Sequence, residues 1–127
     1  MFYLGIDLGG TNIAVGLVDE NGKIVYQDST PTLASRPGEE IVKDMCTLCE
    51  KVVKESGHTM DEVASIGVGC PGTVDNKNGV IAYANNIRME NFPMRKLIQE
   101  HIDKPVNLEN DANAAAYGEY IANGNGV

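Results

Sequence analysis

The chain has 127 residues, of which 43% are hydrophobic and 22% are charged, and these values are typical of a globular domain with its own core. The net charge is −8 and no cluster of Lys and Arg occurs, which argues against a nucleic-acid-binding surface. No apolar run reaches the length of a membrane span, and the first residues lack the basic segment of a secretory signal. Three cysteines, an odd number, do not form a disulfide framework, so we expect a protein of the reducing cytoplasm.

The first thirty residues predict three consecutive antiparallel strands. Apolar, β-prone runs cover residues 1–6 and 13–19, and the glycine-containing segment 7–12 between them is typical of a hairpin turn. Asn21-Gly22 then favours a type I′ turn into a third strand over 23–27.

A long amphipathic helix is predicted between Ser35 and Gly57. Pro37 suits its first turn, two glutamates follow at the positive end of the helix dipole, and Gly57 is placed to end it. The apolar face recurs at spacings of four, three and four and consists of Ile41, Met45, Leu48 and Val52.

The rest of the chain alternates between strands and helices. The apolar run 63–68 predicts a buried strand that is parallel to the first, because a long helix precedes it. A polar stretch rich in Gly and Asn follows, with a short strand over 80–83. A helix over 92–101, a strand over 106–109 and a helix that begins at Asn110-Asp111 complete the order.

This order predicts an α/β domain built on a mixed five-stranded sheet. We expect three antiparallel N-terminal strands beside two parallel ones, with helices on both faces of the sheet. The domain is expected to cover residues 1–122, and residues 123–127 are expected to start an interdomain connection.

The segment 7–12 combines a carboxylate with a turn that suits an anion. Gly9 and Gly10 have no Cβ, so backbone N–H groups can turn inward and a phosphate can approach closely. Thr11 and Asn12 add side-chain donors to the same concavity. Asp7 beside a phosphate suits Mg²⁺, held directly or through water. The two glycines alone would favour a plain tight turn with a solvated Asp.

Two other motifs carry less information. The glycines of 67–72 have the spacing of a dinucleotide-binding loop, but the residues after them do not begin a helix, so we reject that interpretation. Cys46 and Cys49 form a C-x-x-C pair in mid-helix, whereas redox pairs lie at helix N-termini and zinc requires two further ligands. We expect these cysteines and Cys70 to be core or core-flanking residues.

The segment 7–12 resembles the first phosphate motif of the sugar kinases in the actin-like ATPase superfamily, and within that group the chain is similar to the ROK family. Three further segments, at 69–72, 85–94 and 109–114, follow in the order of that family. Gly69, Pro71 and Gly72 resemble its Gly-x-Pro-Gly segment, and residues 109–114 (Glu-Asn-Asp-Ala-Asn-Ala) resemble its catalytic string.

Between these two segments lies the loop 85–94, where Asn86 and Pro93 match the family pattern. Met89 stands where Trp is common, and this departure leaves the identity of the hexose open.

The resemblance implies a ribonuclease-H-like domain, the N-terminal part of an ATP-dependent hexose kinase, with glucokinase as the first expectation. It implies that Asp111 is the catalytic base and that Gly72, Asn86, Asn110 and Asp111 bind the sugar. The ATP phosphates would lie against Gly9, Gly10, Thr11 and Asn12, and Asp7 would support Mg²⁺.

The resemblance also implies partners and alternatives. The expected ligands are glucose and ATP, the full-length protein is expected to form a homodimer, and structural Zn²⁺ would belong only to a segment beyond this chain. The alternatives are a kinase for another sugar, such as fructose or N-acetylmannosamine, a ROK transcriptional regulator, and a sugar-binding module without catalysis. Repressors of the family carry a basic winged-helix domain ahead of this one, and here the first strand starts at the initiating Met.

Overall fold

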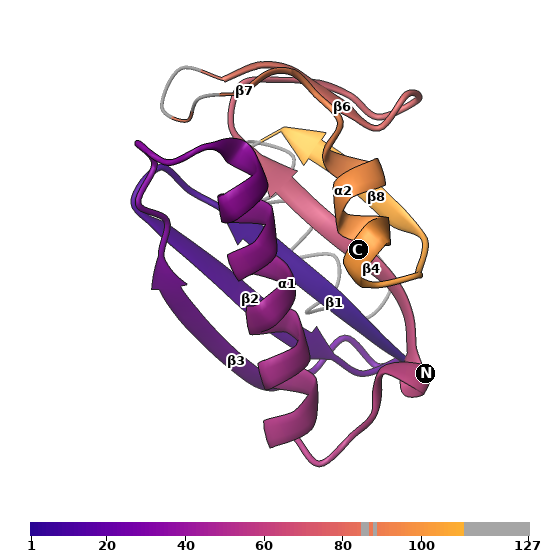
Figure 1. Ribbon diagram of the computed structural model, residues 1–127. Coiled ribbons are helices and arrows are strands. Elements are labelled where there is room, and N and C mark those ends of the chain that lie inside the picture. The colour runs from indigo at the N-terminus through magenta and orange to yellow at the C-terminus, as the bar shows by residue number, and fades with distance from the viewer. Residues whose placement is uncertain (85–86, 88, 111–127) are drawn as a thin grey trace.

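The computed structural model describes residues 1–84, 87 and 89–110, and its main feature is a five-stranded mixed sheet (Figure 1). The strand order across the sheet is β3-β2-β1-β4-β8. Antiparallel pairing joins β1, β2 and β3, whereas β4 pairs in parallel with both β1 and β8. The strands span Phe2–Leu8 (β1), Asn12–Val18 (β2), Ile24–Pro31 (β3), Val63–Cys70 (β4) and Val106–Asn110 (β8). The predicted fold class, with three antiparallel strands beside two parallel ones, is confirmed.

The turn between β2 and β3 differs from the predicted type I′ form. Gly22 has a φ of 81°, whereas Asn21 has a negative φ, and a type I′ turn requires positive values at both positions. The loop has three residues, one more than a type I′ hairpin loop. The N–H of Asp19 donates to the carbonyl of Lys23 at 2.9 Å, and residues 20–22 lie between them. Asp19 Oδ1 also accepts hydrogen bonds from the N–H groups of Asn21 and Lys23. This carboxylate stabilises the three-residue loop.

The predicted long helix is present, and its apolar face is buried against the sheet. Ile41, Met45, Leu48 and Val52 are all buried. Pro37, expected in the first turn, is instead the N-cap, with the extended backbone of ψ 146°. Among the described residues, the helical segments are α1 (Gly38–Glu55), a 3-10 helix (Met60–Glu62) and α2 (Met94–His101).

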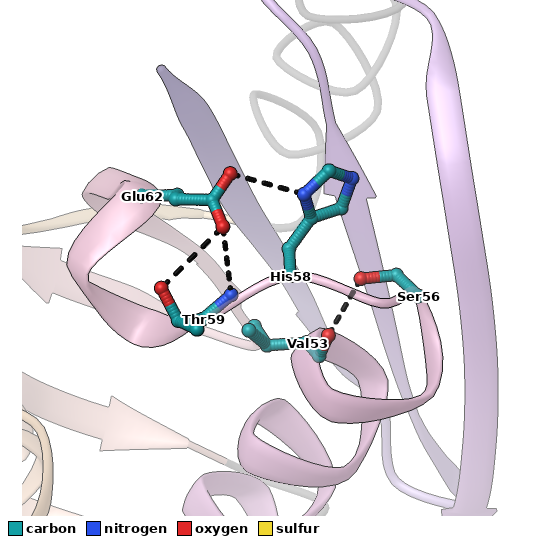
Figure 2. A network of polar contacts seen from close by, with 5 residues as sticks. All are labelled: Val53, Ser56, His58, Thr59 and Glu62. Carbon is teal, nitrogen blue, oxygen red and sulfur yellow. Dashed lines mark hydrogen bonds and ion pairs between the residues drawn. The ribbon is translucent and has the colours of Figure 1, made fainter.

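A polar network fixes the connection from α1 to β4 (Figure 2). Gly57 has a φ of 88° and ends the helix as predicted, and the N–H of His58 donates to the carbonyl of Val53 at 3.2 Å. Glu62 then accepts a hydrogen bond from the N–H of Thr59 at 3.1 Å, and its Oε2 lies 3.0 Å from His58 Nδ1. The network lies at the amino end of β4, at the opposite end of that strand from Gly69, so His58 has a structural role here.

A second, antiparallel sheet lies beyond the carboxyl ends of β1, β4 and β8 (Figure 1). Its order is β5-β6-β7, with bounds Thr73–Asp75, Val80–Ala84 and Met89–Phe92. Only the middle strand was predicted, because the outer two are short and lie in a polar stretch. Phe92, expected to begin a helix, belongs to β7, and α2 begins two residues later at Met94.

The two faces of the main sheet differ in the size of their side chains. Gly5 pairs with Gly16 on β2 and with Gly67 on β4, so small residues lie in a row on one face. On the other face α1 and α2 lie side by side (Figure 1). The helix expected from Asp111 onward lies outside the described residues, so helices on both faces stay a prediction. The β1 side chains buried beneath α1 and α2 are Leu4, Ile6 and Leu8.

Candidate active site

The carboxyl ends of β1, β4 and β8 meet at one edge of the main sheet. Asp7 pairs with Gly69, and Gly69 pairs with Glu109, so the three strands end in one row. On the other side of β1, Ala14 lies opposite Asp7. The side chain of Asp7 is exposed, and Ala14 and Gly69 are too small to cover its carboxylate. Because ligands of α/β sheets bind outside the carboxyl ends of the strands, this edge is the candidate site.

The turn after β1 is held by hydrogen bonds to its carbonyl groups. The N–H of Gly9 donates to the carbonyl of Asn12 at 3.0 Å and closes the turn. Thr32, directly after β3, donates its N–H to the carbonyl of Thr11 at 2.8 Å and its Oγ1–H to the carbonyl of Gly9 at 2.7 Å. Gly10, Thr11 and Asn12 are exposed, whereas Thr32 is buried. The predicted phosphate-binding residues therefore form a fixed turn with one side open to solvent.

Thr32 is not singled out by the sequence. The third strand predicted from the sequence covers residues 23–27, and no pattern assigns a role to Thr32. The side-chain hydrogen bond spans 23 positions in the sequence, so no local pattern indicates it. The only signal was a polar residue directly after a strand, which is common in turns.

Gly72 has a structural reason to be glycine. Its φ is 80°, and a Cβ at this position would collide with the carbonyl oxygen of Tyr83 and lie 3.0 Å from the Cα of Ala84. The glycine thus allows the connection after β4 to pass close to β6. This requirement holds with or without a sugar, so the sugar contact at Gly72 stays a prediction.

The other predicted sugar-binding residues are only partly within the described chain. Asn110 is the last residue of β8, and its backbone pairs with Cys70, one position beyond the row of Asp7. Asn86 and Asp111 lie outside the described residues. The structure therefore brings Asp7, the turn 9–12 and the end of β8 to the same edge, and the placement of the proposed base stays a prediction.

The cysteines are core residues, as the sequence predicts. Cys46, Cys49 and Cys70 are buried. Burial, with a smaller effect of nearby Glu50, raises the pKa of the Cys46 thiol to about 12, and burial also raises the pKa of Cys49 well above its usual value. Both shifts disfavour a reactive thiolate. In the part of the chain that the structure describes, no three His, Cys, Asp or Glu side chains gather into a group that could hold a metal ion.

Comparison with known proteins relates nearly the whole chain to one family. Residues 3–127 match the model described as the ROK family. The glucokinase of Streptomyces coelicolor is 37% identical over 117 residues, which cover 92% of this chain and 35% of that protein. The xylose repressor of Caldicellulosiruptor bescii is 31% identical over 116 residues, which cover 91% of this chain and 29% of that protein.

Solved structures give the same result. The crystal structure of a ROK family glucokinase from Streptomyces griseus, in complex with glucose and AMPPNP, matches with a TM-score of 0.84 and 36% identity over 97% of this chain and 37% of that one. The chain thus spans about a third of the length of the relatives that it matches.

Proposed function

The chain belongs to the ROK family, and on that premise we propose that it carries part of the active site of an ATP-dependent sugar kinase. The proposed reaction transfers the γ-phosphate of ATP to the 6-hydroxyl of a hexose, with glucose as the first candidate. Similarity to a glucokinase, and to a structure that contains glucose and AMPPNP, supports this choice. Met89 stands where the family commonly has Trp, and this departure leaves the identity of the hexose open. Fructose and N-acetylmannosamine are the alternative sugars.

The observation that carries the proposal is the edge where β1, β4 and β8 end beside the turn 9–12. We assign this turn to the ATP phosphates, because a short run of backbone N–H groups forms an anion-binding concavity. A Cβ at Gly9 would lie 3.0 Å from the carbonyl oxygen of Asn12, so a side chain there would require that carbonyl to move by a few tenths of an ångström. Thr11 and Asn12 would add side-chain donors to the backbone N–H of Gly10. Gly9 would lie against the phosphates without donating, because its N–H is bound to the carbonyl of Asn12.

The residues at this edge also fit a magnesium ion. Mg²⁺ is usually bound through one or two carboxylates together with phosphate oxygens and water. Asp7 offers an exposed carboxylate two residues before Gly9, and its neighbours Ala14 and Gly69 leave room beside it. A bound Mg²⁺ would neutralise charge on the phosphates, and Asp7 would hold the ion directly or through water.

On the sugar side we propose Asp111 as the base and Gly72, Asn86 and Asn110 as further contacts. Phosphoryl transfer passes through a largely dissociative transition state, so the base mainly orients the hydroxyl and accepts its proton late. An aspartate of ordinary basicity can therefore serve. β8 brings the chain to the site edge at Asn110, and Asp111 is the next residue in the sequence.

A second candidate is a sugar-responsive transcriptional regulator. The 31% identity to a xylose repressor favours it. A regulator, like a binding module without catalysis, would use the sugar-binding residues and leave the phosphoryl transfer unused. The chain is acidic and has no basic cluster, so contact with DNA would have to come from another segment.

Three further properties are proposals. A cytoplasmic location is proposed from the odd number of cysteines. A homodimer of the full-length protein, and structural Zn²⁺ confined to a segment beyond this chain, are proposed from the family resemblance. The helices in residues 1–84 and 89–110 are all too short or too polar to cross a bilayer.

Turnover of the full-length protein tests the proposed function. We expect ATP-dependent phosphorylation of glucose, measured by coupling glucose 6-phosphate to the reduction of NADP⁺. Asp111→Ala should lower kcat by about 10²- to 10⁴-fold, the usual contribution of a general base. The Kd for ATP should change little, because only hydroxyl orientation and proton acceptance are lost.

Asp103→Ala is the matched control, because Asp103 is exposed between α2 and β8, and it should keep wild-type turnover. Near-normal turnover of Asp111→Ala would remove Asp111 from the mechanism. Sugar binding by the wild type with no turnover would favour the regulator or the binding module.

A further inference from the structure

We propose that Thr32 is a positioning residue that aims the backbone donors of the turn 9–12 toward the phosphates of the nucleotide. The inference rests on the proposed function. Thr32 is 0% exposed and is the one polar residue that is buried in the described part of the chain. A buried hydroxyl is costly unless it is hydrogen-bonded. Here both the Oγ1–H and the N–H of Thr32 donate to carbonyls of this turn.

Peptide geometry converts these two hydrogen bonds into a direction for the N–H groups. In a trans peptide the carbonyl and the N–H of the next residue point in opposite directions, and none of the described peptide bonds is cis. The carbonyl of Gly9 points toward Thr32 Oγ1, so the N–H of Gly10 points away from Thr32. The carbonyl of Thr11 points toward the Thr32 N–H, so the N–H of Asn12 also points away. Thr32 therefore directs two donors away from the buried side of the turn.

Thr32 is itself held from the side of α1. Arg36 Nη2 donates to the carbonyl of Thr32 at 2.7 Å and lies 2.9 Å from Asp44 Oδ2 on α1. In the segment between Thr32 and Arg36, Leu33 has a φ of 53°, a left-handed conformation that a leucine adopts only at an energetic cost. Its carbonyl accepts from the N–H of Arg36 at 3.1 Å and from Arg36 Nε at 3.3 Å. These contacts fix Thr32 before a ligand binds, and donors that are fixed in advance require no reorganisation on binding.

Two substitutions in the full-length protein separate the hydroxyl from the shape of the side chain. Thr32→Val keeps the branched shape and loses the Oγ1–H, whereas Thr32→Ser keeps the hydroxyl. Thr32→Val should raise the KM for Mg-ATP by about three- to tenfold, the worth of about one hydrogen bond, with the KM for glucose unchanged. Thr32→Ser should return the KM for Mg-ATP close to the wild-type value.

Thr30→Val is the matched control, because it makes the same exchange on β3 at a half-buried position. It should leave both KM values unchanged. An equal rise of both KM values in Thr32→Val, or a Ser variant as impaired as the Val variant, would overturn the inference.

A second measurement uses the wild-type protein alone and does not depend on the folding of a variant. In full-length protein labelled with ¹⁵N-glycine and ¹⁵N-asparagine, Mg²⁺ with AMPPNP should shift the amide signals of Gly10 and Asn12. Gly9 is the internal reference, because its N–H is already bound to the carbonyl of Asn12. If AMPPNP binds and the signals of Gly10 and Asn12 do not shift, the inference about Thr32 is overturned and the proposed function is unaffected. Failure of the wild type to bind AMPPNP would overturn the proposed function, and this inference with it.

Discussion

Asp7 is the described residue whose charge the proposed chemistry uses most directly. Its backbone pairs with Ala14 and Gly69 while its side chain is exposed, so Asp7→Asn should remove the charge and leave the strand intact. An amide is a poorer Mg²⁺ ligand than a carboxylate. We therefore expect the KM for Mg-ATP to rise about tenfold or more, which corresponds to ~1.4 kcal/mol or more. Glucose affinity, measured by calorimetry on the full-length protein without nucleotide, should be nearly unchanged.

The control for Asp7→Asn is Asp61→Asn, which makes the same exchange at an exposed position before the amino end of β4. It should change neither affinity. An equal loss of sugar and nucleotide affinity in Asp7→Asn would indicate a damaged fold and would argue against a magnesium ligand.

At the scale of single residues, the sequence revealed those whose signal is local. Gly9 and Gly10 stand together in a short turn between two apolar runs, and this pattern is readable without knowledge of the fold. Thr32 was not predictable, because its partners are 23 positions away and nothing nearby distinguishes it from Thr30. The family resemblance implies that Gly72 binds the sugar, whereas its close approach to the carbonyl of Tyr83 comes from a strand pairing that the sequence does not reveal.

At the scale of elements, strong periodicity decided what could be predicted. The hairpin of β1 and β2, the helix α1 and the buried strand β4 each have long apolar patterns and were predicted near their observed bounds. β5 and β7 have three and four residues, too few for a pattern, and they exist through their pairing with β6. The loop before β3 depends on Asp19, whose carboxylate competes with the Asn-Gly preference.

Arg95 connects α2 with β8 and with the loop between β5 and β6. Its Nε donates to the carbonyl of Val106 at 2.8 Å, and its Nη2 donates to the carbonyl and Oδ1 of Asn76 at 2.6 and 2.8 Å. Asn76 Oδ1 also accepts from the N–H of Leu108 at 2.7 Å on β8, an edge strand of the main sheet. One guanidinium thus connects three elements of the fold.

We expect Arg95→Ala to lower the free energy of unfolding of the 127-residue chain by about 2 kcal/mol or more, because each hydrogen bond from a charged donor contributes roughly 1.5–3 kcal/mol. Urea titration followed by circular dichroism measures the change. Lys96→Ala, at the exposed next position of α2, should stay within about 0.5 kcal/mol of the wild type. Equal urea midpoints of unfolding for the two variants would contradict the role of Arg95 in stabilising the fold.

At the scale of the whole molecule, the proposed site lies at an edge of the described fold. The chain spans about a third of the length of the relatives that it matches. We propose, from its resemblance to the family, that it holds the base, part of the sugar pocket and half of the phosphate cradle. The adenosine pocket and the remaining sugar contacts are expected on a second domain that closes over the first.

We therefore expect the 127-residue chain alone to show no detectable phosphorylation of glucose and to bind glucose at best with millimolar affinity, about −4 kcal/mol or weaker. A partial site makes only some of the contacts but must still offset the full entropic cost of association. It also cannot close over the substrates to exclude water, which this chemistry requires to avoid hydrolysis of ATP. The coupled assay and calorimetry test this expectation, with circular dichroism to establish that the chain is folded and the full-length protein as positive control. Robust phosphorylation of glucose by the folded chain alone would show that it needs no second domain, and would overturn the proposed division of the site.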